Sequence, residues 1–239
     1  MARRGRAGRT RSKRRWLRWL FALLLVAALL AAGFMWWRTG EWTPDPAAYR
    51  DAGVLVSDKA GDVNFRTLNA LGADFAYIEA SHGTAARDLH FTENLENARA
   101  AGLEVGVVHH FDPCVPADGQ SANFVTLVPR EANLLPPAIA LDRIADTCEQ
   151  RVGEAEVESE LMTLINQIEI HAGVPVLLKP SKRFEEEYGI AGRIERNLWL
   201  SQNWTEPDYG RRPWLLWTAN DMLRTEASAQ PIAWVVVRP

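Results

Sequence analysis

The sequence lacks several features that would fix a function at once. It has only two cysteines in 239 residues, and it contains no internal repeat and no low-complexity tract. Neither a glycine-rich phosphate-binding loop nor a serine nucleophile elbow is present. Metal-ligand spacing is also missing, because His109 and His110 are strand neighbours and would point to opposite faces. We therefore expect no metal site and no cofactor.

Acidic residues are absent from residues 1–18, which hold nine of the 27 Lys and Arg residues. The rest of the chain has 18 basic and 30 acidic residues, a net charge near −12. A basic tail can bind nucleic acid, but residues 19–37 carry no charge. A run of about 19 apolar residues can span a bilayer as one helix. We therefore expect a membrane contact at residues 19–37 and no nucleic-acid partner.

The basic flank of this apolar run predicts its orientation. Positive residues stay on the cytoplasmic side, so the N-terminus should be cytoplasmic and the C-terminal domain periplasmic or extracellular. A cleaved signal peptide is the alternative, with small residues at 31–33. We favour an uncleaved anchor, because the run is long and ends in Phe-Met-Trp-Trp. The expected organisation is a basic tail (1–18), a transmembrane anchor (19–37), a linker (38–51) and a barrel domain (52–239).

Beyond the linker, short β-branched runs alternate with apolar residues at helical spacing. This alternation predicts an α/β fold with a parallel sheet, and the number of units favours a modified TIM-like (β/α) barrel over an open sheet. The last third has strands with little helix between them. Strands are expected at 54–56, 75–80, 105–111, 138–141, 174–178, 198–200, 214–217 and 232–237, and helices at 65–71, 91–98, 122–128, 157–168 and 184–188.

Asp142 follows a short apolar run that begins after a double proline. Such a run is typical of a strand buried on both faces. In an α/β barrel the active site lies where the strands end, so Asp142 would lie at the chemistry. Two alternatives stay open. Asp142 is either the remaining member of a carboxylate pair that cleaves sugars or a loop-capping acid in a domain without catalysis.

Eight short segments follow one another at the spacing of a known family. In order and with matching gaps, they resemble glycoside hydrolase family 25, the lysozymes (N-acetylmuramidases) with a modified α/β barrel. The resemblance covers residues 52–237 and implies peptidoglycan, or a related glycan, as the partner. The segments are residues 53–57, 77–84, 100–106, 109–113, 135–137, 175–178, 198–200 and 213–217.

The chain departs from this family at most acidic positions of the active site. The central strand normally ends Asp-x-Glu, the catalytic pair, but here it reads Ala140-Leu141-Asp142. Other acids of the family pattern are replaced by Leu55, by His82 and, in the last strand, by Ala233. The Tyr expected after Val176-Leu177 is Leu178.

Glycosidic cleavage needs a carboxylic acid and a second carboxylate. The resemblance leaves Asp142 as the catalytic candidate, with Asp58, Glu79, Asp112 or His82 as a substitute partner. Glu79 should share a strand side with Tyr77 and Ser81, because side chains alternate. The non-catalytic interpretations are that Asp58 is a turn residue, that Asp112 caps a loop and that His82 makes loop hydrogen bonds. Candidate substrate-binding residues are His82, His109, Asp112 and Trp217, the last as a strand-end ring on which a sugar could stack.

Cys114 and Cys148 lie just after adjacent strands, at the same expected end of the barrel. Outside the cytoplasm they could pair, so they are the disulfide candidate. The sequence thus favours a lysozyme-like glycoside hydrolase of the cell envelope that acts on peptidoglycan. The alternative is a catalytically degenerate lysozyme-fold domain that binds peptidoglycan or envelope proteins, and a hydrolase of another glycan is a third possibility. Whether the chain is an enzyme stays open.

Overall fold

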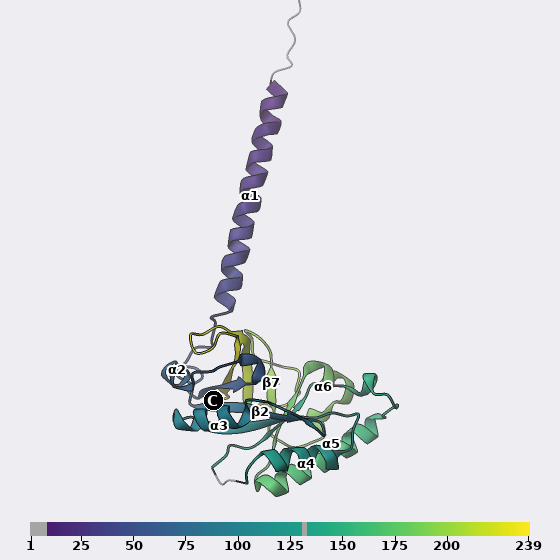
Figure 1. Ribbon diagram of the computed structural model, residues 1–239. Helices are drawn as coiled ribbons and strands as arrows, with labels where there is room; N and C mark the ends of the chain where they lie inside the picture. The colour runs from purple at the N-terminus through teal and green to yellow at the C-terminus, as the bar shows by residue number, and fades with distance from the viewer. Residues whose placement is uncertain (1–8, 131–132) are drawn as a thin grey trace, which may run out of the picture. The chain divides into compact units, whose positions relative to one another are not determined.

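The computed structural model describes residues 9–130 and 133–239. The chain divides into two compact units, Met1–Glu41 and Trp42–Pro239. In the first, α1 (Arg9–Thr39) contains one stretch, Trp16–Thr39, that is long and apolar enough to cross a membrane and is not buried by protein (Figure 1). A signal sequence near an N-terminus would have the same length and composition.

The second unit is built on one sheet that nearly closes into a barrel. Its strands follow the order β6-β5-β4-β2-β1-β9-β8-β7, and a parallel bridge between Leu178 and Leu198 brings the two end strands together. The short β3 pairs with β2. The strands are β1 (Ala52–Val56), β2 (Phe75–His82), β3 (Ala86–Arg87), β4 (Glu104–His110), β5 (Ala138–Leu141), β6 (Leu177–Pro180), β7 (Trp199–Ser201), β8 (Leu216–Leu223) and β9 (Ile232–Val237).

Strand direction makes this barrel a modified one. Strands β1, β2, β4, β5 and β6 pair in parallel, and β7 is parallel to β8. Strand β9 is antiparallel to both of its neighbours, β1 and β8. The carboxyl ends of the parallel strands therefore meet at one end of the barrel. The predicted α/β fold with a barrel-like sheet is confirmed.

Helices cover the outer face of the sheet. Among them, α4 and α5 pack against each other, as Figure 1 shows. Capping residues mark the ends of several helices. The side chains of Asn64 and Ser181 accept hydrogen bonds from backbone N–H groups in the first turns of α2 and α6. Gly173, in a left-handed conformation, ends α5. The helices are α2 (Phe65–Ala70), α3 (Phe91–Ala100), α4 (Ala117–Leu127), α5 (Glu154–Ala172) and α6 (Lys182–Tyr188), with 3₁₀ turns at Asp58–Ala60, Ala145–Thr147 and Ile190–Gly192.

The core has two layers, one inside the barrel and one between the sheet and the helices. In the inner layer the Tyr77 ring of β2 lies against Gly106 of β4. A Cβ on Gly106 would lie 2.3 Å from this ring, so the position requires glycine. The Tyr77 hydroxyl donates a hydrogen bond to the Pro136 carbonyl, 3.0 Å away. The inner cluster consists of Phe75, Tyr77, Val108, Ala138, Ala140, Leu177, Trp199, Leu216 and Val235.

Most expected elements are present, but two late strands differ from the prediction. The apolar run at 174–178 was expected to be a strand, whereas β6 begins only at Leu177, since the chain turns at Gly173 and Pro175 cannot donate to a ladder. Strand β8 extends to Leu223, beyond the predicted end at Trp217, because polar residues such as Thr218 and Asn220 pair with β9. Hydrophobic pattern alone does not reveal these polar strand residues.

Candidate site at the barrel mouth

Five polar side chains lie where the parallel strands end, and we call this group the mouth. Four of them stand two residues beyond a member of the inner cluster and so point to the same side of the sheet. The fifth, His82, stacks its ring on that of His110 at 5.7 Å between centroids. The mouth consists of Glu79 and His82 of β2, His110 of β4, Asp142 directly after β5, and Lys179 of β6.

His110 lies between two carboxylates. Its Nδ1 is 3.0 Å from Oδ2 of Asp142, and its Nε2 is 3.2 Å from Oε1 of Glu79. The His110 side chain is 21% exposed, whereas the Asp142 side chain is 47% exposed. A central cation thus joins two anions from neighbouring strands, and one of the two carboxylates is open to solvent.

This arrangement shifts the pKa values of both partners. Burial of the His110 ring lowers its pKa, but the hydrogen bond to Asp142 and the adjacent carboxylate of Glu79 outweigh burial and raise the pKa to about 9. Burial also raises the pKa of Asp142, but the hydrogen bond from His110 and the charge of Lys179 lower it below its ordinary value. At neutral pH the mouth therefore holds an imidazolium and an ionised Asp142.

A bulge in β2 sorts the neighbouring side chains onto two sides of the sheet. The register of the pairing with β4 shifts between Glu79 and Ser81. The prediction that these two residues share one side of the strand is therefore wrong, because a bulge interrupts the alternation of side chains. Ser81 instead lies 2.8 Å from Nδ1 of His109. The bulge brings His82 back to the inner side, beside His110.

Asp112 is held inside the loop that follows β4. Its carboxylate accepts hydrogen bonds from Arg143 at 2.7 Å and from the Cys114 backbone at 2.9 Å. Gln120 accepts from the Asp112 backbone N–H and donates to its carbonyl. Asp112 was a candidate for substrate binding, but its carboxylate is already paired and organises the loop.

A disulfide between Cys114 and Cys148, with Cα atoms 5.2 Å apart, joins the loops after β4 and β5. Beside it is a hollow of about 610 Å³ whose wall includes Asp112, Arg143 and Glu160. The bridge therefore ties together the two loops that carry the Asp112–Arg143 pair, next to the strand end that carries Asp142.

Two predicted substrate-binding residues lie away from the mouth. His109 is fully buried between the sheet and α4, where it contacts the Phe124 ring. Burial lowers its pKa to about 3, so it is neutral. Trp217 is only 2% exposed and packs on the outer side against Trp42 and Tyr49, near the start of β8 rather than at a strand end. Neither side chain presents a surface to a sugar in this structure.

The positions that the resemblance assigns to missing acids lie around the same mouth. Leu55 and Ala233 are direct partners in the β1–β9 ladder, and facing residues of an antiparallel pair present their side chains on the same side. Leu55 packs against the inner cluster, and Ala140 belongs to it. These three positions therefore supply no acid, base or nucleophile.

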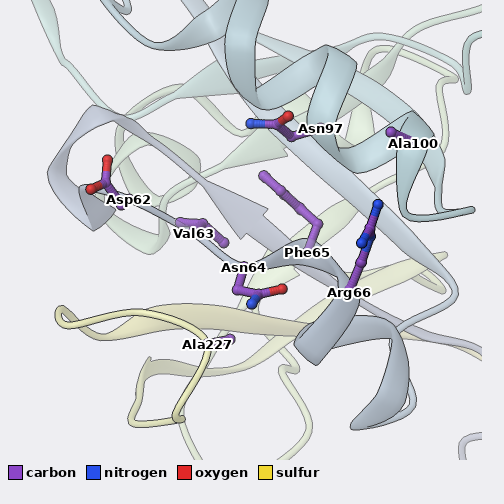
Figure 2. Close-up of a pocket in the computed structure, with 8 residues that line it drawn as sticks. All are labelled: Asp62, Val63, Asn64, Phe65, Arg66, Asn97, Ala100 and Ala227. Carbon is purple, nitrogen blue, oxygen red and sulfur yellow. The ribbon is translucent and has the colours of Figure 1, made fainter.

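Another hollow, of about 450 Å³, has no mouth residue in its wall. It is bounded by the first turn of α2, by Asn97 and Ala100 of α3, and by Ala227 (Figure 2). One of its polar groups, Asn64, already caps α2. Within residues 9–130 and 133–239, no group of three or more His, Cys, Asp or Glu side chains is arranged to hold a metal ion.

Sequence reasoning missed His110, Lys179 and Arg143 as site residues. It placed Glu79 among the substitute partners and considered His110 only as a metal ligand. Strand alternation was the available signal, because His110 stands two residues after the inward Val108. Lys179 could not be found in this way, since the expected strand ended one residue before it.

Comparison with known proteins shows what the barrel is similar to. Residues 54–223 match the model of the family described as glycosyl hydrolases family 25. The solved structure of a family 25 glycosyl hydrolase from Bacillus anthracis aligns with a TM-score of 0.75 and 26% identity, over 84% of this chain and 93% of that one. An uncharacterized protein of Escherichia coli O6:H1, YegX, is 22% identical over 198 residues, 78% of this chain and 69% of that protein. Lysozyme M1 of Streptomyces globisporus is 33% identical over 72 residues, 30% of this chain and 24% of the lysozyme.

Proposed function

Because this chain belongs to glycosyl hydrolase family 25, we propose that its barrel binds the glycan strands of peptidoglycan at the mouth and does not cleave them. One observation carries this proposal. His110 lies within 3.2 Å of both Glu79 and Asp142, so the carboxylate at the end of the central strand is locked in an ion pair. The fold is that of a lysozyme, and we infer from the charges of the mouth whether this fold binds a glycan or cleaves it.

A general acid has to carry a proton before the glycosidic oxygen can receive it. Enzymes of this kind raise the pKa of the acid in an apolar pocket. Here the hydrogen bond from His110 and the charge of Lys179 lower the pKa of Asp142 instead. Asp142 is therefore anionic at neutral pH and cannot protonate a leaving group.

The second role in cleavage lacks an unpaired group, because Glu79, the other carboxylate of the mouth, faces His110 at 3.2 Å. A nucleophile or base should face the sugar from the same mouth, but Leu55, Ala140 and Ala233 offer only methyl and methylene groups at the positions where the resemblance implies acids. Glycan binding makes weaker demands. The half-exposed carboxylate of Asp142 can accept hydrogen bonds from sugar hydroxyl and amide groups, and the exposed imidazole of His82 can donate or accept them.

We further propose that residues 19–37 anchor the chain in a membrane, with residues 1–18 on the cytoplasmic side and the barrel domain, residues 52–239, in the periplasm or outside the cell. The single apolar helix and its basic N-terminal flank support this orientation. The disulfide Cys114–Cys148 fits an oxidising compartment. A barrel tethered there would hold glycan strands near the membrane surface.

Hydrolysis remains a second candidate because of Glu79. It places a second carboxylate at the mouth, on the far side of the His110 ring from Asp142. If a bound glycan displaced His110, these two carboxylates would be the pair that cleavage requires.

The two candidates differ in what they release. The full-length protein in detergent micelles is mixed with purified peptidoglycan, and sedimentation of the protein and release of soluble muropeptides are measured together. We expect co-sedimentation of wild type without release, and no release by Asp142→Ala either. Release by wild type that Asp142→Ala abolishes would establish the hydrolase instead. Absence of co-sedimentation would refute both.

A further inference from the structure

Lys179 is the charged residue of the mouth whose ammonium makes no direct polar contact, although its charge acts on the nearby Asp142. Within residues 9–130 and 133–239, its ammonium has no hydrogen bond and no ion pair. His110, by contrast, faces carboxylates with both ring nitrogens, and the nearby Arg143 is paired with Asp112. The donors of Lys179 are therefore free for a ligand.

The position of this ammonium is fixed by the barrel interior. Lys179 pairs with Ala140 of β5, two residues after the inward Leu177. Its Nζ lies 5.6 Å from the centroid of the Trp199 ring, a favourable place for a cation. Trp199 is itself fully buried and donates its indole N–H to Thr218 at 2.8 Å. A rigid ring thus supports the ammonium, which lowers the entropy lost when a ligand binds.

The charges around Lys179 do not oppose an anionic ligand. Glu79 and Asp142 share the positive charge of His110, and Lys179 supplies a second positive charge beside Asp142. The four charged groups of the mouth therefore balance at neutral pH. A carboxylate that approaches Lys179 meets free N–H donors in a region without net negative charge.

We propose that Lys179 recognises a carboxylate on the bound glycan, so that the mouth selects strands whose sugars carry an acidic substituent over neutral N-acetylglucosamine polymers. This inference rests on the proposed glycan binding and names the feature of the strand that is read. Muramic acid carries such a carboxylate on its lactyl ether. An ammonium bound to a carboxylate is a charge-assisted contact, worth about tenfold in affinity.

The test compares two soluble probes of equal length. One is a tetrasaccharide of alternating N-acetylglucosamine and N-acetylmuramic acid, and the other is the tetrasaccharide of N-acetylglucosamine alone. Affinities for the full-length protein in micelles are measured by titration calorimetry at low salt. Wild type should bind the acidic probe about tenfold more tightly than the neutral one.

Lys179→Met keeps the aliphatic stem and should abolish this preference, while Lys179→Arg should retain it. Lys182→Met removes an exposed lysine outside the mouth and should change nothing. Equal binding of both probes by wild type, or a preference that survives in Lys179→Met, overturns the role of Lys179 but leaves glycan binding intact. Failure of wild type to bind either probe overturns the proposed function as well.

Discussion

His110 determines the chemistry of the mouth because a single imidazole is shared by two carboxylates. The pair of contacts at 3.0 and 3.2 Å keeps the ring protonated and keeps Asp142 ionised. The same aspartate in an apolar pocket would become a proton donor. The low pKa of Asp142 is therefore set by its neighbour His110 and not by its position at the strand end.

The pKa of His110 predicts how stability changes in alkali. Its value of about 9 exceeds the ordinary 6.5, so the ion pairs stabilise the fold fully below pH 6.5 and are lost as the pH rises through 9. We expect the free energy of unfolding in urea to fall by about 1–3 kcal/mol between pH 6.5 and 9.5. Asp142→Asn should flatten this fall.

Asp146→Asn is the matched control, because Asp146 is as exposed as Asp142 and pairs with the surface residue Arg183. The alkaline fall should persist in that variant. An identical pH dependence in wild type and Asp142→Asn would show that Asp142 does not hold the proton on His110.

At the scale of the elements, the sequence predicted strands best where hydrophobic pattern and burial coincide. Strands β5 and β9 have the expected bounds because their residues are all apolar and all buried except Ala233 and Val237, which are partly buried. The bulge at Glu79–Ser81 and the start of β6 at Leu177 leave no such pattern, because they depend on pairing between strands. Asp142 could therefore be found from the sequence, but its partners could not.

The disulfide should act on the loops that frame the mouth. It closes a separation of 34 residues, and loss of such a constraint costs about 2–4 kcal/mol in the chain-entropy model. We expect the double variant Cys114→Ala/Cys148→Ala to unfold at lower urea concentration and to exchange amide hydrogens faster at residues 112–116. Chemically reduced wild type should behave in the same way. Unchanged unfolding and exchange would mean that the loops are held by their hydrogen bonds alone.

Gly106 provides a test of packing inside the barrel. A Cβ at this position would lie 2.3 Å from the Tyr77 ring, so Gly106→Ala should destabilise the fold by about 1–3 kcal/mol. Gly153→Ala is the control, since a Cβ added there would meet nothing within 4 Å and its φ of −84° suits alanine. Urea unfolding of both variants measures the difference. A Gly106→Ala variant as stable as wild type would contradict the close approach of the ring.

At the scale of the whole molecule, the proposed anchor and barrel give a protein that holds glycan close to a membrane. If the helix is an uncleaved anchor, the protein recovered from membranes should have the mass of the full 239-residue chain. It should also resist extraction by carbonate. A mature protein that begins after the small residues at 31–33 would instead identify the segment as a signal peptide.

The protonation state of His110 at neutral pH tests the central claim most directly. ¹⁵N chemical shifts of the imidazole nitrogens, assigned by comparison with a His110→Gln variant, report whether both nitrogens carry protons. We predict that both are protonated at pH 7.5 in wild type and that deprotonation begins only as the pH approaches about 9. A neutral His110 ring at pH 7.5 would contradict the ion pair between His110 and Asp142 on which the proposal of binding without cleavage rests.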